Sequence, residues 1–453
     1  GGGGVEALVF ILLLCLQHPQ LLLVLMLGGG LVGLIGYLGS DNDWDSVAPT
    51  TATAPVPRPR PALDQIRTID PNFSAVLFED FVFRLYATAQ TFAGGAGKLD
   101  ELAPYLSAAA RRALTDRQKQ RPVTGVVIGQ MRVSRINLPG PAEESGDFTA
   151  FLKVGIQFEA NYSVGSGPGS RRFVVEDWLL RREAGARTKP PGARRFPCPN
   201  CGAPWRGDAA AGTQKCSSCG AVVDNGRFDW QVEEINVRRE TDRVPGLEAD
   251  VPEQGTSLPT VVDENFAGAW QSLRQEDPGV DDATTAARLK YIYTTLNDAW
   301  SRNHLDTARP VISDGLADYF HYWIDAYESA GLRNVLEDTR LTRHELVRVV
   351  RDRHYDALTI RIWATGKDYV VRIDNGTVVR GSRDRDRDYS EYWTLIRSGA
   401  RRGPSRADNM CGSCGAALTV TMSGECEHCG SHVTAGEFDW VLSKIEQDEA
   451  YRG

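Results

Sequence analysis

Histidine is scarce in this sequence, and positive charge is not in excess. The 453 residues include 7 histidines, and none lies between His18 and His304. Any histidine-based catalytic site would therefore be confined to one half of the chain. Lysine and arginine number 51 against 59 aspartate and glutamate residues, which gives a formal net charge of −8. Because phosphate binding needs a concentrated Lys/Arg surface, this balance argues against nucleic acid as a partner.

Charge is also missing near the start of the chain. Residues 5–39 are almost wholly apolar, and the 19 residues Leu21–Gly39 carry no charge. About 20 apolar residues cross a bilayer as a helix. We therefore predict a single-pass transmembrane anchor within residues 5–39, with a spanning helix from Leu21 to Leu38. A signal peptide is the alternative, but no basic region precedes the apolar run and acidic residues follow it.

The composition allows folded domains after this segment. Apolar residues make up 42% of the chain and charged residues 24%, so most of it can bury a core. At roughly 100–200 residues per domain, the length predicts two to four domains. Residues 40–63 are rich in Pro, Ala and Thr, a composition that forms an extended, semi-rigid spacer. We expect this linker to hold the soluble part away from the bilayer.

An internal repeat is the strongest organisational signal. Two segments recur in the same order, Glu176–Arg182 and Gly226–Trp230 in the first half, Glu391–Arg397 and Gly436–Trp440 in the second. In both halves a pair of Cys-x-x-Cys motifs lies between these segments, and the last cysteine precedes the final tryptophan by 11 residues. The sequence therefore predicts a tandem duplication of one domain.

Each copy shows helix signals followed by strand signals. In the first copy, Ser74 is expected to cap a helix, and aromatic and aliphatic residues then recur at helical spacing. The first copy is predicted to contain a second helix at Leu99–Leu114 and strands at Val123–Leu138, Phe148–Tyr162 and Arg171–Arg182. The second copy is predicted to contain helices around Leu289–Trp300 and Thr307–Ser329 and strands at His344–Val350, Tyr355–Ala364, Asp368–Ile373 and Thr377–Arg380. The fold class is therefore α+β, with domains at residues 64–237 and 264–447 and helices packed on an antiparallel sheet in each.

Two local signals in the second copy predict a turn and a loop. Asn375-Gly376 is typical of a two-residue hairpin turn, in which both residues need positive φ. The run Arg383–Asp388 alternates in charge, and we interpret it as a solvated loop rather than a binding patch.

Eight of the nine cysteines form two sets with metal-ligand spacing. The sets are Cys198, Cys201, Cys216 and Cys219 in a segment at 196–222, and Cys411, Cys414, Cys426 and Cys429 in a segment at 409–432. Four thiolates at this spacing suit tetrahedral Zn²⁺, and a glycine follows the second cysteine of every motif, where it permits the necessary turn. We predict two structural zinc ribbons, each inserted in the last hairpin of its domain.

Disulfide bonds and redox chemistry are the two alternatives to zinc binding for these cysteines. The cysteines could form two disulfides per segment, or a redox-active dithiol, although no βαβ pattern surrounds them. A catalytic zinc ion requires an open coordination position, and four cysteines leave none. His428 and His432 lie beside the last motif, and we expect both to be bystanders.

The order of these motifs resembles a known family. The Trp-x-Leu-x-Arg strand at Trp178 and the final Phe-Asp-Trp strand at Trp230, each repeated in the second copy, are similar to the C-terminal domain of the mitochondrial inner-membrane import translocase subunit 44. The chain looks more like bacterial relatives of that protein, which combine an apolar segment with this domain and embedded zinc ribbons. The resemblance covers Asp64–Ile235 and Phe266–Ile445, together with the anchor.

The resemblance implies a fold and a class of function. It implies two cone-shaped domains like nuclear transport factor two, with helices on a curved sheet. In mitochondria the family member sits on the inner membrane, contacts lipid and tethers a chaperone to a protein-conducting channel. We therefore expect a membrane-anchored, non-enzymatic scaffold that binds the bilayer and a membrane-protein or chaperone partner. We expect it in a bacterial inner membrane, with the soluble domains on the cytoplasmic side, where eight thiols stay reduced.

A ligand-binding module or enzyme that uses the interior of the cone is the alternative. Four histidines outside the cysteine segments could serve such a site: His304, His321, His344 and His354. None of them lies in a recognisable catalytic motif, and the first copy has no counterpart.

Overall fold

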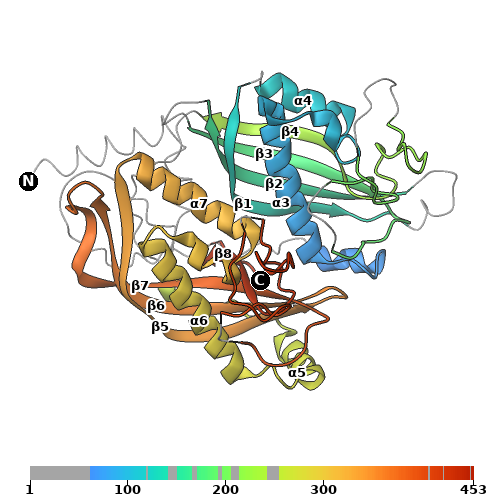
Figure 1. Ribbon diagram of the computed structural model, residues 1–453. Coiled ribbons are helices and arrows are strands. Elements are labelled where there is room, and N and C mark those ends of the chain that lie inside the picture. The colour runs from blue at the N-terminus through green and yellow to red at the C-terminus, as the bar shows by residue number, and fades with distance from the viewer. Residues whose placement is uncertain are drawn as a thin grey trace, which may run out of the picture.

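The computed structural model describes ten stretches of the chain, starting at Ala62 (Figure 1). They are residues 62–118, 121–140, 150–165, 171–191, 196–205, 214–241, 255–406, 409–421, 423–448 and 450–453. The expected anchor at residues 5–39 and nearly all of the linker at 40–63 lie outside them. Among the described helices, none combines the length and the apolar character needed to cross a bilayer.

The first half of the described chain has helices followed by strands. Its helical segments are η2 (Leu63–Thr68), α3 (Ala75–Thr91), η3 (Phe92–Ala96), η4 (Leu99–Leu102) and α4 (Ala108–Gln118). Its strands are β1 (Val123–Asn137), β2 (Phe151–Val164), β3 (Arg171–Glu183) and β4 (Gln231–Thr241). Ser74 caps α3 as predicted, because its hydroxyl accepts a hydrogen bond from the Leu77 amide.

The second half follows the same order. Its helical segments are η5 (Gly255–Ser257), α5 (Phe266–Glu276), α6 (Asp282–Ser301), η6 (Leu305–Thr307), η7 (Arg309–Val311) and α7 (Asp314–Ser329). Its strands are β5 (Leu332–Arg351), β6 (Tyr355–Arg372), β7 (Val378–Ser398) and β8 (Val441–Gln447). Asp281 begins α6 with a capping box, in which its side chain and that of Thr284 exchange hydrogen bonds with each other's backbone.

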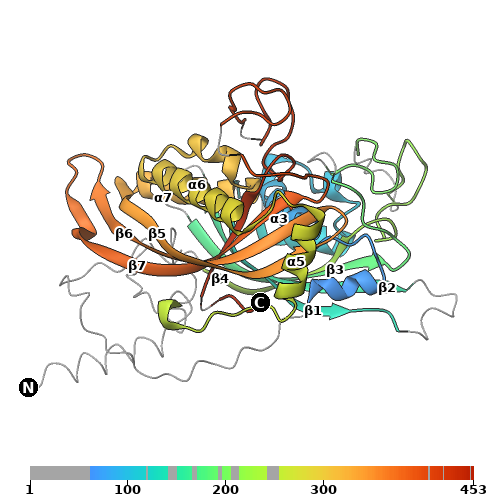
Figure 2. The ribbon, with the colours of Figure 1, turned by 90° about the horizontal axis from the view of Figure 1, so that it is seen from below.

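The strands form two antiparallel sheets, one in each half. Their orders are β1-β2-β3-β4 and β5-β6-β7-β8, so every strand pairs with its neighbour in sequence. Figure 2 shows α6 and α7 lying over one face of the second sheet. The α+β prediction is therefore confirmed at the level of two antiparallel sheets covered by helices. Because β3 pairs with β4 and β7 with β8, each cysteine segment forms the connection of the last hairpin.

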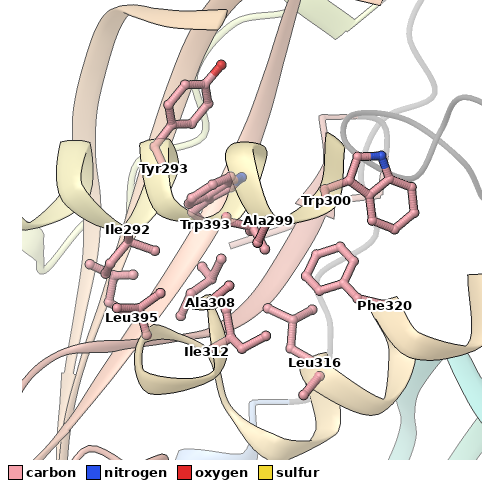
Figure 3. Packing of buried hydrophobic residues seen from close by; sticks show 14 of the residues in the cluster. Ile292, Tyr293, Ala299, Trp300, Ala308, Ile312, Leu316, Phe320, Trp393 and Leu395 are labelled. Carbon is pink, nitrogen blue, oxygen red and sulfur yellow. The ribbon is translucent and has the colours of Figure 1, made fainter. Parts of the chain in front are cut away.

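The core of each half lies between its helices and its sheet. In the second half, Ile292 and Trp300 of α6, Phe320 of α7, and Trp393 and Leu395 of β7 pack together (Figure 3). These side chains are at most 2% exposed. In the first half, α3, α4 and the sheet enclose a second cluster of comparable make-up. Burial of apolar surface on this scale is the main favourable term in folding.

The arginine that recurs in the two tryptophan strands pairs with an aspartate in each half. The guanidinium of Arg182 lies 2.8 Å from the carboxylate of Asp70, and that of Arg397 lies 3.0 Å from Asp277. All four residues are buried. Each pair ties the third strand of a sheet to the segment just before a long helix of the same half, α3 after Asp70 and α6 after Asp277, which explains why the arginine recurs.

Acid should weaken the first of these pairs. Burial alone would raise the pKa of Asp70, but hydrogen bonds from Thr188 and the charge of Arg182 hold it below its usual value. The pair therefore contributes stability above the ordinary carboxyl pKa of about 3.9, and this stability is lost as pH falls further. As the pH falls from about 6 to about 3, we expect the free energy of unfolding to decrease more for the wild type than for Asp70→Asn. Urea unfolding at a series of pH values measures this, and parallel curves for both proteins would contradict it.

Several predicted boundaries were wrong. The helix expected at Leu99–Leu114 is broken into η4 and α4, and the helix expected from Thr307 begins only at Asp314. Pro104 and Pro310 lie in these gaps, and proline lacks the amide that a helix interior needs. The strands expected at Tyr355–Ala364 and Asp368–Ile373 are one strand, β6.

The turn and the loop predicted in the second half also differ. Gly376 has a φ of +70°, but Asn375 is not among the described residues with positive φ, so the turn is not the predicted two-residue type. The run Arg383–Asp388 lies within β7 rather than in a loop. Alternating charges have the period of a strand, and Arg387 pairs with Asp368 of β6 at 3.1 Å.

Candidate metal centres

The structure brings the first set of predicted ligands together. The sulfur atoms of Cys198, Cys201, Cys216 and Cys219 all lie within 4.8 Å of one another. The Sγ atoms of Cys198 and Cys219 are 3.9 Å apart, and those of Cys201 and Cys216 are 3.8 Å apart. In each motif the first cysteine is buried and the second is exposed. The cluster therefore lies at the surface, with half of its thiols turned inward.

The backbone around each Cys-x-x-Cys motif forms a tight knuckle. The amide of Gly202 donates to the carbonyl of Cys198 at 2.9 Å, and that of Gly220 donates to Cys216 at 2.8 Å. Gly202 and Gly220 have φ values of +76° and +71°, a left-handed conformation that favours glycine. The glycine after each second cysteine is therefore required by the turn, as the sequence predicted.

The second set repeats this geometry. Cys411, Cys414, Cys426 and Cys429 also lie within 4.8 Å of one another, with sulfur separations of 3.8 Å and 4.0 Å for the two closest pairs. The amides of Gly415 and Gly430 donate to the first cysteine of their motifs at 2.9 Å and 2.8 Å. Both clusters therefore present four thiols in the same arrangement.

Both clusters fit a tetrahedral metal ion. A Zn–S bond of about 2.3 Å places the sulfur atoms of a regular tetrahedron about 3.8 Å apart. Two separations in each cluster lie between 3.8 Å and 4.0 Å, and the others are within 4.8 Å. All eight cysteines are free, so the disulfide alternative is not observed. A four-thiolate site has no open position for substrate, and its metal would supply folding free energy rather than catalysis.

Hydrogen bonds favour the thiolate at Cys429 and Cys216, whereas the pKa of Cys198 is raised to about 12 and that of Cys414 to about 11. The hydroxyl and the backbone amide of Ser431 bond to the sulfur of Cys429 and lower its pKa to about 6. Burial would raise the pKa of Cys216, but amides of Cys219 and Ser218 outweigh it and lower the pKa to about 6. A thiolate is the form that binds metal.

The first cysteine segment is anchored to the helices of its own half. The indole nitrogen of Trp205 donates to the carbonyl of Asp100 at 3.1 Å, and the Tyr105 hydroxyl donates to the carbonyl of Pro197 at 2.6 Å. Phe196 packs against Phe81 and Tyr105. The segment is therefore fixed on α3 and η4.

The second cysteine segment is anchored to α7 by polar contacts. The ring of His432 lies 3.2 Å from Asp314 and 2.9 Å from Glu437, and the Thr434 hydroxyl donates to Asp314 at 2.7 Å. Asp314 is the first residue of α7. His432 was expected to be a bystander; it is instead a contact between the segment and the helix. Thr434 is 1% exposed and its hydroxyl donates to Asp314, so the set of His432, Asp314 and Thr434 offers no accessible nucleophile.

A buried charged network that the motifs did not reveal lies inside the first half. Glu176 is fully buried and pairs with Arg117 of α4. It also accepts hydrogen bonds from Tyr162 at 2.9 Å, from the indole of Trp178 at 2.7 Å and from Gln90 at 3.2 Å. Every oxygen of this carboxylate has a donor, as a buried charge requires.

A related arrangement lies inside the second half. The indole of Trp393 donates to Glu391 at 2.8 Å, matching the contact between Trp178 and Glu176. The hydroxyls of Tyr293 and Tyr389 are 2.8 Å apart. The recurrence of Glu-x-Trp in both tryptophan strands is the sequence signal that could have identified both carboxylates.

The histidines named for a catalytic alternative do not gather. His304 precedes η6, His321 is on α7, His344 is on β5, and His354 is in the turn before β6. The structure thus brings together the cysteines and not the histidines.

Comparison with known proteins agrees with the sequence resemblance. Residues 266–406 match the family model of the Tim44-like domain, so this part of the second half is similar to that domain. The match runs from the start of α5 through β7 and ends before the second cysteine cluster. No curated protein matches the chain.

Proposed function

We propose that this chain is a membrane-tethered, non-enzymatic adaptor that binds protein partners at a bacterial inner membrane. The observation that carries the proposal is the Tim44-like domain at residues 266–406. It is supported by the uncharged run Leu21–Gly39, which is long enough to span a bilayer. Two closed four-cysteine clusters, suited to structure rather than turnover, support it further.

The first half is proposed to be a second copy of the same domain. Its sheet has the same strand order, and its Arg182–Asp70 pair corresponds to Arg397–Asp277. The backbone supports this as well, because Ser107 donates to Val232 as Ser313 donates to Leu442, at 2.9 Å and 2.8 Å. Two cone-shaped copies would present two separate partner surfaces from one anchor.

Zinc is the metal proposed for both clusters, and the cytoplasmic side is the proposed location of the folded part. Four thiolates in a tetrahedron are typical of Zn²⁺, and reduced thiols persist in the cytoplasm. The proposed partners are the lipid bilayer and a membrane protein or chaperone. Nucleic acid is not proposed, given the net charge of −8.

Membrane extraction and crosslinking test the adaptor. We expect the full chain to stay in the membrane pellet after an alkaline carbonate wash, and a variant lacking residues 5–39 to be released. In-cell crosslinking should recover the same membrane protein or chaperone with the full chain, and not with residues 1–63 alone. Release of the full chain by carbonate would contradict the anchor, and equal recovery by residues 1–63 would contradict the adaptor.

A small-ligand-binding role for the second half is the second candidate. Asn297 is buried beside Tyr293, and in the described part of the chain its side-chain carbonyl oxygen has no hydrogen-bond partner. A bound polar molecule would satisfy that oxygen. Native mass spectrometry of the purified chain tests this candidate, which requires a stoichiometric added mass that Asn297→Leu abolishes.

A further inference from the structure

The two halves of the chain contact each other along a surface that we call the seam. Its first part joins the start of α3 to the far side of the second sheet. Val76 and Leu77 of α3 pack against a buried cluster formed by Tyr355, Ala357, Ile396 and Val441. Beside it, the ammonium of Lys444 lies 3.0 Å from the carboxylate of Glu79.

The second part of the seam joins α7 to β1, which lie side by side in Figure 1. Val127 of β1 belongs to the buried core of the second half. Tyr322 of α7 packs against Gly125, and the guanidinium of Arg171 lies 5.4 Å from its ring. A helix of the second half therefore packs against the first sheet at β1.

Two of the elements that the second half contributes to this surface are connected to its cysteine segment, while Tyr355 and Ala357 lie on β6 and Ile396 lies on β7. β8, which carries Val441 and Lys444, follows that segment in the chain. The first residue of α7, Asp314, is held by His432 and Thr434 from the same segment. The second cysteine segment therefore contributes to both parts of the seam, through β8 in the first part and through α7 in the second.

The first cysteine segment has no comparable position. Its anchoring contacts, from Trp205 to Asp100 and from Tyr105 to Pro197, stay within the first half. The two clusters have the same geometry, but only the second is connected to the seam. The first cluster can therefore serve as a control for the second.

Two buried polar groups at the seam have no hydrogen-bond partner among the described residues. Tyr322 is buried, and within the described residues its hydroxyl has no hydrogen-bond partner. The indole nitrogen of its neighbour Trp323 is also buried without a partner there. Buried polar groups without partners favour exposure to water, so the closed seam depends on the elements that hold it.

We propose that metal bound at the second cluster locks the two halves together, and that its loss opens the seam while both cores stay folded. The proposal rests on the metal binding proposed above. Without metal, the second segment loses its fixed shape, the contact of His432 and Thr434 with Asp314 is released, and α7 and β8 are no longer held against the first half. The adaptor would then present its two domains independently.

Hydrogen exchange of the full chain tests the lock with two matched variants. Cys414→Ser and Cys201→Ser each remove the exposed second cysteine of a first motif. The readout is exchange at Ala75–Glu79 and Val123–Ile128, which belong to the first half and reach the second cluster only through the seam. We expect Cys414→Ser to lose one of two bound metals and to exchange there roughly tenfold faster. Cys201→Ser should also lose one metal, with wild-type exchange at these positions.

A third variant keeps the thiols and removes the contact. Thr434→Val with His432→Gln should retain two metals and still speed exchange at Val123–Ile128, the stretch of β1 against which α7 packs. This variant tests the proposal even if Cys414→Ser fails to fold. The lock is overturned if the seam stays protected in both of these proteins, or if Cys201→Ser opens it equally. A wild type that binds no metal would instead overturn the metal assignment itself, which metal analysis of the purified chain detects separately.

Discussion

Replacing Arg117 by methionine should destabilise the first half of the protein by about 3–5 kcal/mol, because removal of one partner leaves an uncompensated buried charge. Glu176 is fully buried and Arg117 is its paired cation. The remaining donors, from Tyr162, Trp178 and Gln90, are neutral and cannot replace that charge. The free energy of unfolding, from urea titration followed by circular dichroism, measures the loss.

Two comparisons separate the buried charge from the loss of packing. Arg112→Met, at an exposed position on the same helix, should change stability little. Adding Glu176→Gln to Arg117→Met should recover much of the loss, because no buried charge then remains. A loss of the same size in the double variant would show that the charge is not the cause.

Local spacing was sufficient to predict the two cysteine clusters but not this network. A Cys-x-x-Cys knuckle is set by four consecutive residues and a following glycine, so the sequence carries its geometry directly. Arg117 and Glu176 are 59 positions apart and meet only when α4 packs on the sheet. No pattern along the chain pairs them, although the repeated Glu-x-Trp marks one partner.

The repeated arginine shows the same limit. The tryptophan strands were recognised as a repeat, but the reason for Arg182 and Arg397 became visible only with Asp70 and Asp277, which precede α3 and α6. Periodicity also failed at Arg383–Asp388. A segment with charged residues on both faces was predicted to be a loop. A long hairpin can nevertheless expose both of its faces, and its charges can then form ion pairs across the strands, as Arg387 does with Asp368.

Chelation should unfold both cysteine segments and leave both sheets intact. Each segment contributes only a small buried apolar cluster, consisting of Cys198, Cys216 and Val223 in the first and Cys411, Cys426 and Val433 in the second. Two cysteines and one valine cannot offset the conformational entropy of ordering such a segment. In zinc-finger peptides the metal supplies an apparent binding free energy of about 10–16 kcal/mol at pH 7. The cores between helices and sheets form without these residues.

The measurement is hydrogen exchange of the full chain before and after treatment with excess EDTA, alongside metal analysis. Amides of the knuckles, such as Gly202 and Gly415, should lose protection entirely, while those in the middle of β2 and β6 should keep it. Returning Zn²⁺ should restore the knuckles, whereas Mg²⁺ should not, because it prefers oxygen ligands. Knuckle amides that remain protected in metal-free protein would show that the segments fold on their own and that their structure does not depend on zinc.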